Sequence, residues 1–133
     1  MTPTPSALPY LLVGAGGFVG AIARFGVARL IGAYVDTRFP LATFIINISG
    51  SFLLGVLGAV VVQKTMPGSD AMRLALGVGF LGAYTTFSTF EFETHALVDD
   101  GSWMLGLTNV TVSVIVGFLA VRAGILVAKT WLA

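Results

Sequence analysis

The stretch Leu41–Val62, LATFIINISGSFLLGVLGAVVV, decides the fold of this chain. No charged residue occurs between Phe39 and Gln63. A helix needs about 20 mostly apolar residues to cross the roughly 30 Å hydrocarbon core of a bilayer. Residues 41–62 are therefore predicted to form a transmembrane helix.

Charged residues divide the rest of the chain into three further stretches of similar length. They cover residues 10–33, with Arg24 and Arg29 in the second half, residues 71–95 and residues 102–127. The connections between them are short. Apolar residues make up 56% of the chain and charged residues 10%, against about 45–50% and about 25% in ordinary globular proteins. The sequence predicts an all-α membrane protein, a single domain over residues 1–133 with four transmembrane helices.

Composition also excludes several classes of function. The net charge of +1 gives no basic face for a nucleic acid. The chain has no cysteine, and His95 is its only histidine, so thiol chemistry and histidine-based catalytic sets are absent. No Lys or Arg precedes Arg24, so a secretory signal is not expected. The chain is not expected to be an enzyme.

Basic residues at the ends of the predicted spans are nearly balanced between the two sides of the membrane. With four spans, one side carries Lys64, Arg73, Arg122 and Lys129, and the other carries Arg24, Arg29 and Arg38. Because an excess of basic residues sets orientation, a balanced chain has little preference for either one. This pattern suggests that the chain inserts both ways and pairs with an antiparallel copy.

Polar residues within the spans are the first candidates for function, because polar groups at membrane depth are costly and rarely face lipid. Asn47 and Ser51 are four residues apart and share one helix face. Their N–H and O–H groups are donors without a fixed charge, which suits a small anion that must bind and leave again. The alternative role is an interhelical hydrogen bond.

The third span contains the segment Thr85-Thr-Phe-Ser-Thr-Phe90, directly after Gly79-Phe-Leu-Gly82. Four hydroxyl residues in five positions favour an interrupted helix. An interruption at membrane depth would expose backbone carbonyls, which are hard ligands for a small cation. Phe87 and Phe90 lie on similar faces of a helix, and their ring edges carry partial positive charge that can contact an anion. Plain packing is the alternative for both rings.

The fourth span and the span ends carry the remaining polar groups. Asn109, Ser113 and Gly117 recur every four residues and form a narrow polar stripe, which could also serve helix contacts. Arg24 either reaches an interface or sets a positive potential at a pore mouth. Glu91, Glu93 and His95 mark the interfacial end of the third span. The 17 glycines, among them Gly16, Gly20, Gly55 and Gly79, predict close helix packing.

These motifs resemble the Fluc (also called CrcB) family of fluoride channels, over about residues 10–128. The matching segments are Gly16-Gly-Phe-Val-Gly-Ala-Ile-Ala-Arg24, Phe44-Ile-Ile-Asn-Ile-Ser-Gly-Ser-Phe-Leu-Leu-Gly55, Gly79-Phe-Leu-Gly-Ala-Tyr-Thr-Thr-Phe-Ser-Thr-Phe90 with Glu93-Thr94, and more weakly Asn109-Val-Thr-Val-Ser113 with Gly117. Glu91 and Asn109 depart from many relatives, which have a small residue and sometimes a tyrosine there.

The resemblance implies a dual-topology antiparallel homodimer with two fluoride pores and a broken third helix. It implies that the fluoride path is lined by Asn47, Phe87, Ser88, Thr89, Phe90 and Ser113. It also implies that the carbonyls of Gly82 and Thr85 hold a structural sodium ion at the dimer interface. Arg24 would lie at a pore vestibule and Glu93 at a pore end.

The expected function is passive export of fluoride across the inner membrane of a bacterium, which lowers fluoride toxicity. A small four-helix multidrug exporter is the alternative, but that class needs a carboxylate in the first span. The first span here contains Arg24 and no Asp or Glu. A structural membrane protein is a third possibility, which would explain the glycines but not the grouped Asn, Thr and Phe residues.

Overall fold

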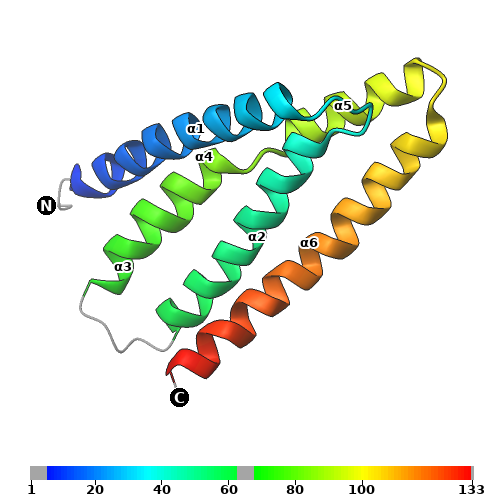
Figure 1. Cartoon of the computed structure of the whole chain (residues 1–133). Coiled ribbons are helices and arrows are strands. Elements are labelled where there is room, and N and C mark those ends of the chain that lie inside the picture. The colour runs from blue at the N-terminus through cyan, green and yellow to red at the C-terminus, as the bar shows by residue number, and fades with distance from the viewer. Residues whose placement is uncertain (1–5, 63–67, 133) are drawn as a thin grey trace, which may run out of the picture.

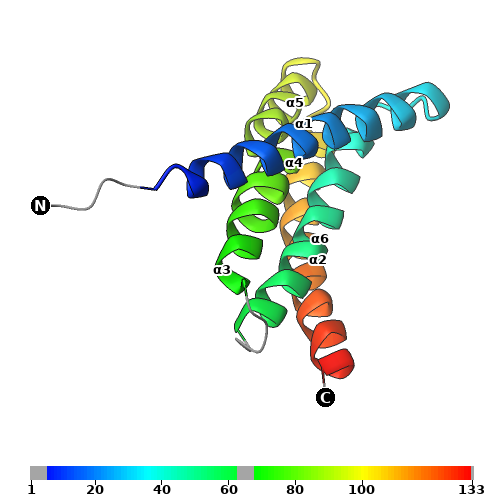
Figure 2. The ribbon, with the colours of Figure 1, turned by 90° about the vertical axis from the view of Figure 1, so that its left-hand side faces the viewer.

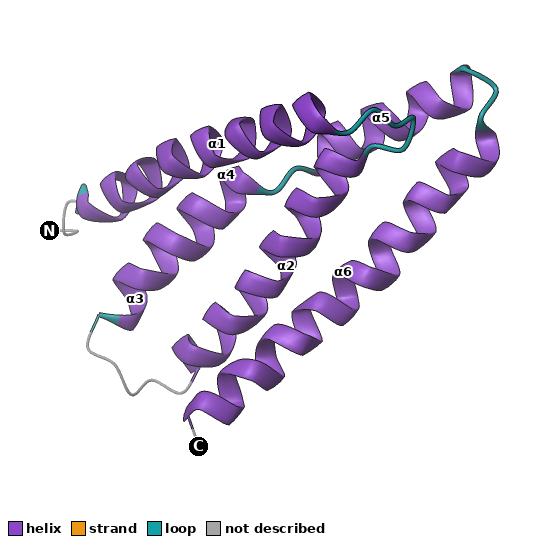
Figure 3. Cartoon of the chain, viewed as in Figure 1, coloured by secondary structure: helices purple, strands orange, loops and turns teal. Residues whose placement is uncertain are grey.

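The computed structural model describes residues 6–62 and 68–132, and within these ranges all regular structure is helical (Figure 3). The long helices are α1 (Leu8–Tyr34), α2 (Leu41–Val62) and α6 (Trp103–Leu132). Between α2 and α6 lie shorter segments: α3 (Ser69–Met72), the π-helix η1 (Arg73–Leu81), α4 (Gly82–Tyr84) and α5 (Phe87–Asp99). Figure 1 shows α2 lying between the α3–α4 segment and α6.

Helices α1, α2 and α6 are each long and apolar enough to cross a membrane, with mean hydropathy of 1.7, 2.1 and 2.3 over their most apolar windows. Their large apolar side chains remain exposed, as at Phe18, Val114 and Phe118. Such extensive apolar exposure is not tolerated in water and is satisfied by lipid or by protein. The chain is therefore a multi-pass membrane protein.

The predicted spans agree closely with these helices, except for the third. The second prediction matches α2, and the first and fourth differ from α1 and α6 by a few residues at their ends. Residues predicted as the third span form two helical pieces, 69–84 and 87–99, with the interruption at Thr85 and Thr86. The connection between the second and third spans has the turn-like residues Lys64, Pro67, Gly68 and Asp70, of which Lys64 and Pro67 lie outside the described residues. Gly68 and Asp70, which belong to the same predicted turn, are described, and Gly68 has a φ of 84°, a left-handed conformation that favours glycine.

Close backbone contacts pack the helices in two main pairs, α1 with the α3–α4 segment and α2 with α6. α1 crosses over the α3–α4 segment (Figure 2), and a Cβ on Gly79 would lie 2.6 Å from the Val13 carbonyl oxygen. A Cβ on Gly20 would meet the Phe80 carbonyl oxygen in the same crossing. Between α2 and α6, a Cβ on Gly55 would meet the carbonyl oxygen of Val121. The predicted packing role of these glycines is confirmed, since only small residues permit such approach.

Candidate functional site

The site is built around the interruption between α4 and α5. Thr85 (φ −78°, ψ 158°) and Thr86 (φ −149°, ψ 117°) both have extended backbone. The Thr85 hydroxyl donates to the Leu81 carbonyl (2.9 Å), which also accepts from the Thr85 N–H (3.0 Å). Threonine competes in this way for the backbone partners of a helix, so it favours helix ends. The helix consequently stops at Tyr84.

A new helix starts directly after the interruption because Thr86 caps it. The Thr86 hydroxyl oxygen accepts from the Thr89 N–H (3.3 Å) and its O–H donates to the Thr89 hydroxyl (2.9 Å). This arrangement is the usual N-cap, in which a side-chain oxygen satisfies a free backbone N–H of the first turn. Thr89 therefore has a local structural partner, and its predicted place in an ion path remains a prediction.

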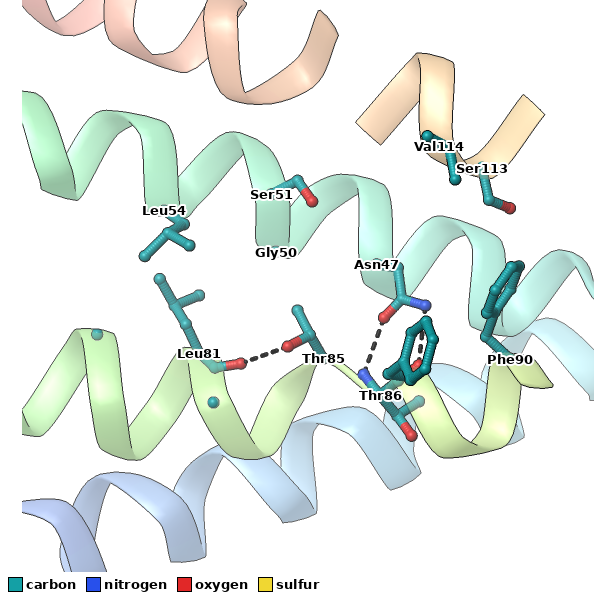
Figure 4. A pocket seen from close by; sticks show the side chains of 13 residues that line it. Asn47, Gly50, Ser51, Leu54, Leu81, Thr85, Thr86, Phe90, Ser113 and Val114 are labelled. Atoms are coloured by element: carbon teal, nitrogen blue, oxygen red, sulfur yellow. Dashed lines mark hydrogen bonds between the residues drawn. The ribbon is translucent and has the colours of Figure 1, made fainter. Parts of the chain in front are cut away.

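Asn47 of α2 holds the interruption in place. Its Nδ2 donates to the Thr86 carbonyl (3.0 Å), and its Oδ1 accepts from the Thr86 N–H (2.8 Å), as Figure 4 shows. The side-chain amide thus pairs with Thr86 as another peptide group would. Because the N–H requires an oxygen partner and the carbonyl requires a nitrogen partner, the orientation of the amide is fixed. One of the two Nδ2 hydrogens is used, and one remains.

A pocket of about 370 Å³ lies beside this pair (Figure 4). It is bounded by α2, the segment around the interruption and α6, and most of its wall is apolar. Its lining residues are Asn47, Gly50, Ser51, Leu54, Gly77, Leu81, Gly82, Thr85, Thr86, Phe87, Phe90, Ser113 and Val114. None of them carries a charge, so any ion that enters meets only neutral donors, acceptors and ring edges.

The two phenylalanines of the site differ in environment. Their ring centroids are 5.8 Å apart, with planes tilted by 40°. Phe90 is buried, with 7% of its surface exposed, whereas Phe87 is 74% exposed. The sequence placed both on similar helix faces, but Phe87 is the first residue of α5, and most of its surface is exposed although it also lines the pocket. Phe87 is consequently free to contact a lipid or a second protein chain.

A chain of hydrogen bonds joins α6 to α5 at one end of the site. Ser113 donates to Asn109 Oδ1 (3.3 Å), Asn109 Nδ2 donates to the Thr94 hydroxyl (2.8 Å), and Thr94 donates to the Phe90 carbonyl (2.7 Å). Asn109 is almost fully buried, with 1% exposed. The Asn109 amide therefore makes a hydrogen bond between α6 and α5, which is the alternative role that the sequence allowed for this residue. Ser113 is also one of the residues that line the pocket.

The structure brings most of the predicted site residues together. Asn47, Gly82, Thr85, Phe87, Phe90 and Ser113 all line the one pocket. Ser88 and Thr89 are exposed on the first turn of α5 and do not line it. Arg24 is half-buried on α1, and Glu93 is half-buried on α5, also outside the pocket. Glu93 Oε2 is a buried atom without a hydrogen-bond partner in the described part of the chain.

Four residues at the site were not among the predicted site residues, although Ser49 belongs to the polar group around Asn47 and Thr86 to the hydroxyl segment of the third span. Thr86 and Gly50 line the pocket, and a Cβ on Gly50 would collide with the Thr85 methyl group. Ser49 and Tyr84 form a hydrogen bond across the same helix contact (2.9 Å). Gly50 follows Asn47 by three residues and therefore shares its helix face, a signal that could have placed it beside the interruption.

Comparison with known proteins agrees with the resemblance drawn from the motifs. The model of the CrcB-like family, described as "CrcB-like protein, Camphor Resistance (CrcB)", matches residues 11–125. A protein of Solibacter usitatus named "Fluoride-specific ion channel FluC" is 43% identical over 122 residues, which cover 92% of this chain and 99% of that protein. One of the same name in Chlorobium luteolum is 44% identical over 124 residues, covering 93% and 95%. The chain therefore belongs to the CrcB-like family.

Proposed function

We propose that this chain is a subunit of a fluoride-selective channel that lets fluoride leave the cytoplasm passively and so lowers its toxicity. The names of the two relatives support this function. The observation that carries it is the Asn47–Thr86 pair, which leaves one amide N–H as a donor of fixed direction at an uncharged pocket. In this proposal the protein is a channel and not an enzyme.

The pocket offers an anion weak, fixed partners in place of water. Asn47 Oδ1 is turned to the Thr86 N–H, so its negative end does not repel an anion there. The remaining amide hydrogen, the hydroxyl of Ser51 and the edges of Phe87 and Phe90 supply partial positive charge. Conduction requires binding strong enough to replace hydration but weak enough for release, which neutral groups provide better than a lysine or arginine.

The path continues beyond the pocket in this proposal. Ser113 and the exposed hydroxyls of Ser88 and Thr89 extend it, Arg24 draws anions to a vestibule, and Glu93 lies near an end. The multidrug-exporter alternative loses support, because α1 contains no carboxylate to couple protons to a cationic substrate.

We further infer that residues 69–99 make the third of four crossings of the membrane and that two copies pair antiparallel in the inner membrane. The 74% exposure of Phe87 and the balanced basic residues support a second copy covering the interruption. In the pair, a sodium ion at the interface would have a structural role.

The backbone at the interruption has the chemistry of a sodium ligand. In a continuous helix, the Gly82 carbonyl would accept from the N–H of Thr86, four residues later. Here that N–H donates to Asn47 instead, so the Gly82 carbonyl is released beside the pocket. Gly82 and Thr85 would hold the ion through their carbonyl oxygens, which are hard donors. A bound sodium would supply positive charge and order the interface.

The proposal is tested by reconstituting the purified protein in liposomes loaded with potassium fluoride. After a potassium ionophore removes the electrical limit, a fluoride electrode should record rapid release, and the same vesicles loaded with chloride should release far less. Fluoride that stays inside, while detergent still releases it, would contradict the proposal.

A further inference from the structure

The hydrogen bond between Tyr84 and Ser49 holds the other side of the interruption. Tyr84 is the last residue of α4 and directly precedes the two extended residues, Thr85 and Thr86. Asn47 binds the second of these, Thr86. Residues 47 and 49 of α2 thus contact residues 86 and 84 in antiparallel order. Thr85 lies between Tyr84 and Thr86, and Gly50 lets its side chain approach the α2 backbone.

The donor in this bond follows from the partners of Ser49. The Ser49 hydroxyl donates to the carbonyl of Ile45 in its own helix (2.7 Å), and Ile46 O lies 3.1 Å away. A serine hydroxyl has one hydrogen, which is directed to these carbonyls. The Tyr84 hydroxyl, 2.9 Å from Ser49 Oγ, is therefore the donor and Ser49 is the acceptor.

Tyr84 is also held by packing. It is 8% exposed, and its ring stacks on Phe80 with centroids 5.7 Å apart and planes 6° from parallel. A Cβ on Gly50 would lie 3.4 Å from Tyr84 Cδ1, so the ring lies against α2.

We propose that Tyr84 and Ser49 are positioning residues, whose hydrogen bond fixes the carbonyl end of α4 against α2 and so sets the shape of the pocket. The proposal rests on the proposed channel function for its flux readout. It predicts an asymmetry, because a buried donor that loses its partner is costly, whereas removal of both partners is nearly neutral. Ser49→Ala leaves the Tyr84 hydroxyl without a hydrogen-bond acceptor, but Tyr84→Phe leaves the Ser49 hydroxyl bonded to the Ile45 carbonyl.

The test compares Ser49→Ala, Tyr84→Phe and the double variant in liposomes that contain at most one channel each. The release rate then reports each channel, and the fraction of vesicles that release fluoride reports how much protein is folded. We expect Ser49→Ala to slow each channel about tenfold or more, Tyr84→Phe less than about threefold, and the double variant to return to the Tyr84→Phe rate. Thr108→Ala and Tyr34→Phe are matched controls, since Thr108 bonds only Met104 of its own helix and Tyr34 is 82% exposed.

Three results would overturn the proposal. The double variant could be as slow as Ser49→Ala, Ser49→Ala could conduct at the wild-type rate, or only the fraction of active vesicles could fall. If the wild-type protein releases no fluoride, the channel function fails, and thermal unfolding in detergent then tests the bond by itself. In that case Ser49→Ala should have a lower Tm than the double variant, and the reverse order would rule the bond out.

Discussion

Replacing Asn47 with leucine is expected to reduce the fluoride flux of each channel by at least about a hundredfold, because it removes both partners of the Thr86 peptide group. Thr86 is 9% exposed, so its N–H and carbonyl would be left buried and unsatisfied. Each such group costs about 1–3 kcal/mol, which favours return of the Thr86 N–H to the Gly82 carbonyl. The helix would then continue through the interruption and remove the free carbonyl from the pocket. Liposome flux and amide hydrogen exchange at Thr86 measure the two consequences.

Asn47→Asp is the matched comparison for this variant. Aspartate keeps an oxygen for the Thr86 N–H, but it places a second oxygen against the Thr86 carbonyl and a negative charge on the anion path. Its Thr86 N–H should keep a partner on residue 47, so that the interruption persists, while its fluoride flux stays low because of the added charge. Wild-type flux in Asn47→Leu would show that the pair does not maintain the conducting structure.

Gly55→Leu is expected to destabilise the chain by at least about 3 kcal/mol, at the upper end of what overpacking costs. Even a Cβ at Gly55 meets the Val121 carbonyl oxygen, its carbonyl carbon at 3.0 Å and its Cα at 3.1 Å, so α6 would have to move away from α2. The Tm for thermal unfolding in detergent measures the effect, and the yield of monodisperse protein is a second measure.

Gly58→Leu is the control, because it lies on the same helix with no atom within 4 Å of its Cβ position. The two variants add the same side chain to the same helix. The change in helix propensity and the added hydrophobicity are therefore the same in both, and a difference in stability reports the contact with α6. Equal loss of stability in both would mean that the α2–α6 contact is not as close as described.

The helices follow from local properties of the sequence, and so could be predicted. An apolar, charge-free run as long as residues 41–62 crosses a bilayer as a helix, because its backbone groups must bond within the segment. The helix α2 has the same bounds. The interruption was also predictable, because four hydroxyl residues in positions 85–89, following Gly82, weaken the helix locally. The packing role of Gly55 and Gly79 needed no more than their small size.

The site could be predicted only in part, because its decisive contacts join distant residues. Asn47 and Thr86 are 39 positions apart, and the sequence shows two polar residues but not that they pair. Phe87 and Phe90 look equivalent in the sequence, yet the fold buries only Phe90. Asn109 shows the same limit, since its role is set by Thr94, a residue on another helix.

Selectivity for fluoride over chloride is measured by the reversal potential of the reconstituted channel in a planar bilayer. The two sides would hold sodium fluoride and sodium chloride at equal concentration, so that sodium contributes no gradient. The account predicts a reversal potential displaced by more than about 60 mV in the direction of fluoride permeation, the value for a tenfold preference between univalent ions. A reversal potential near zero would contradict it, because the pore would then conduct both anions alike.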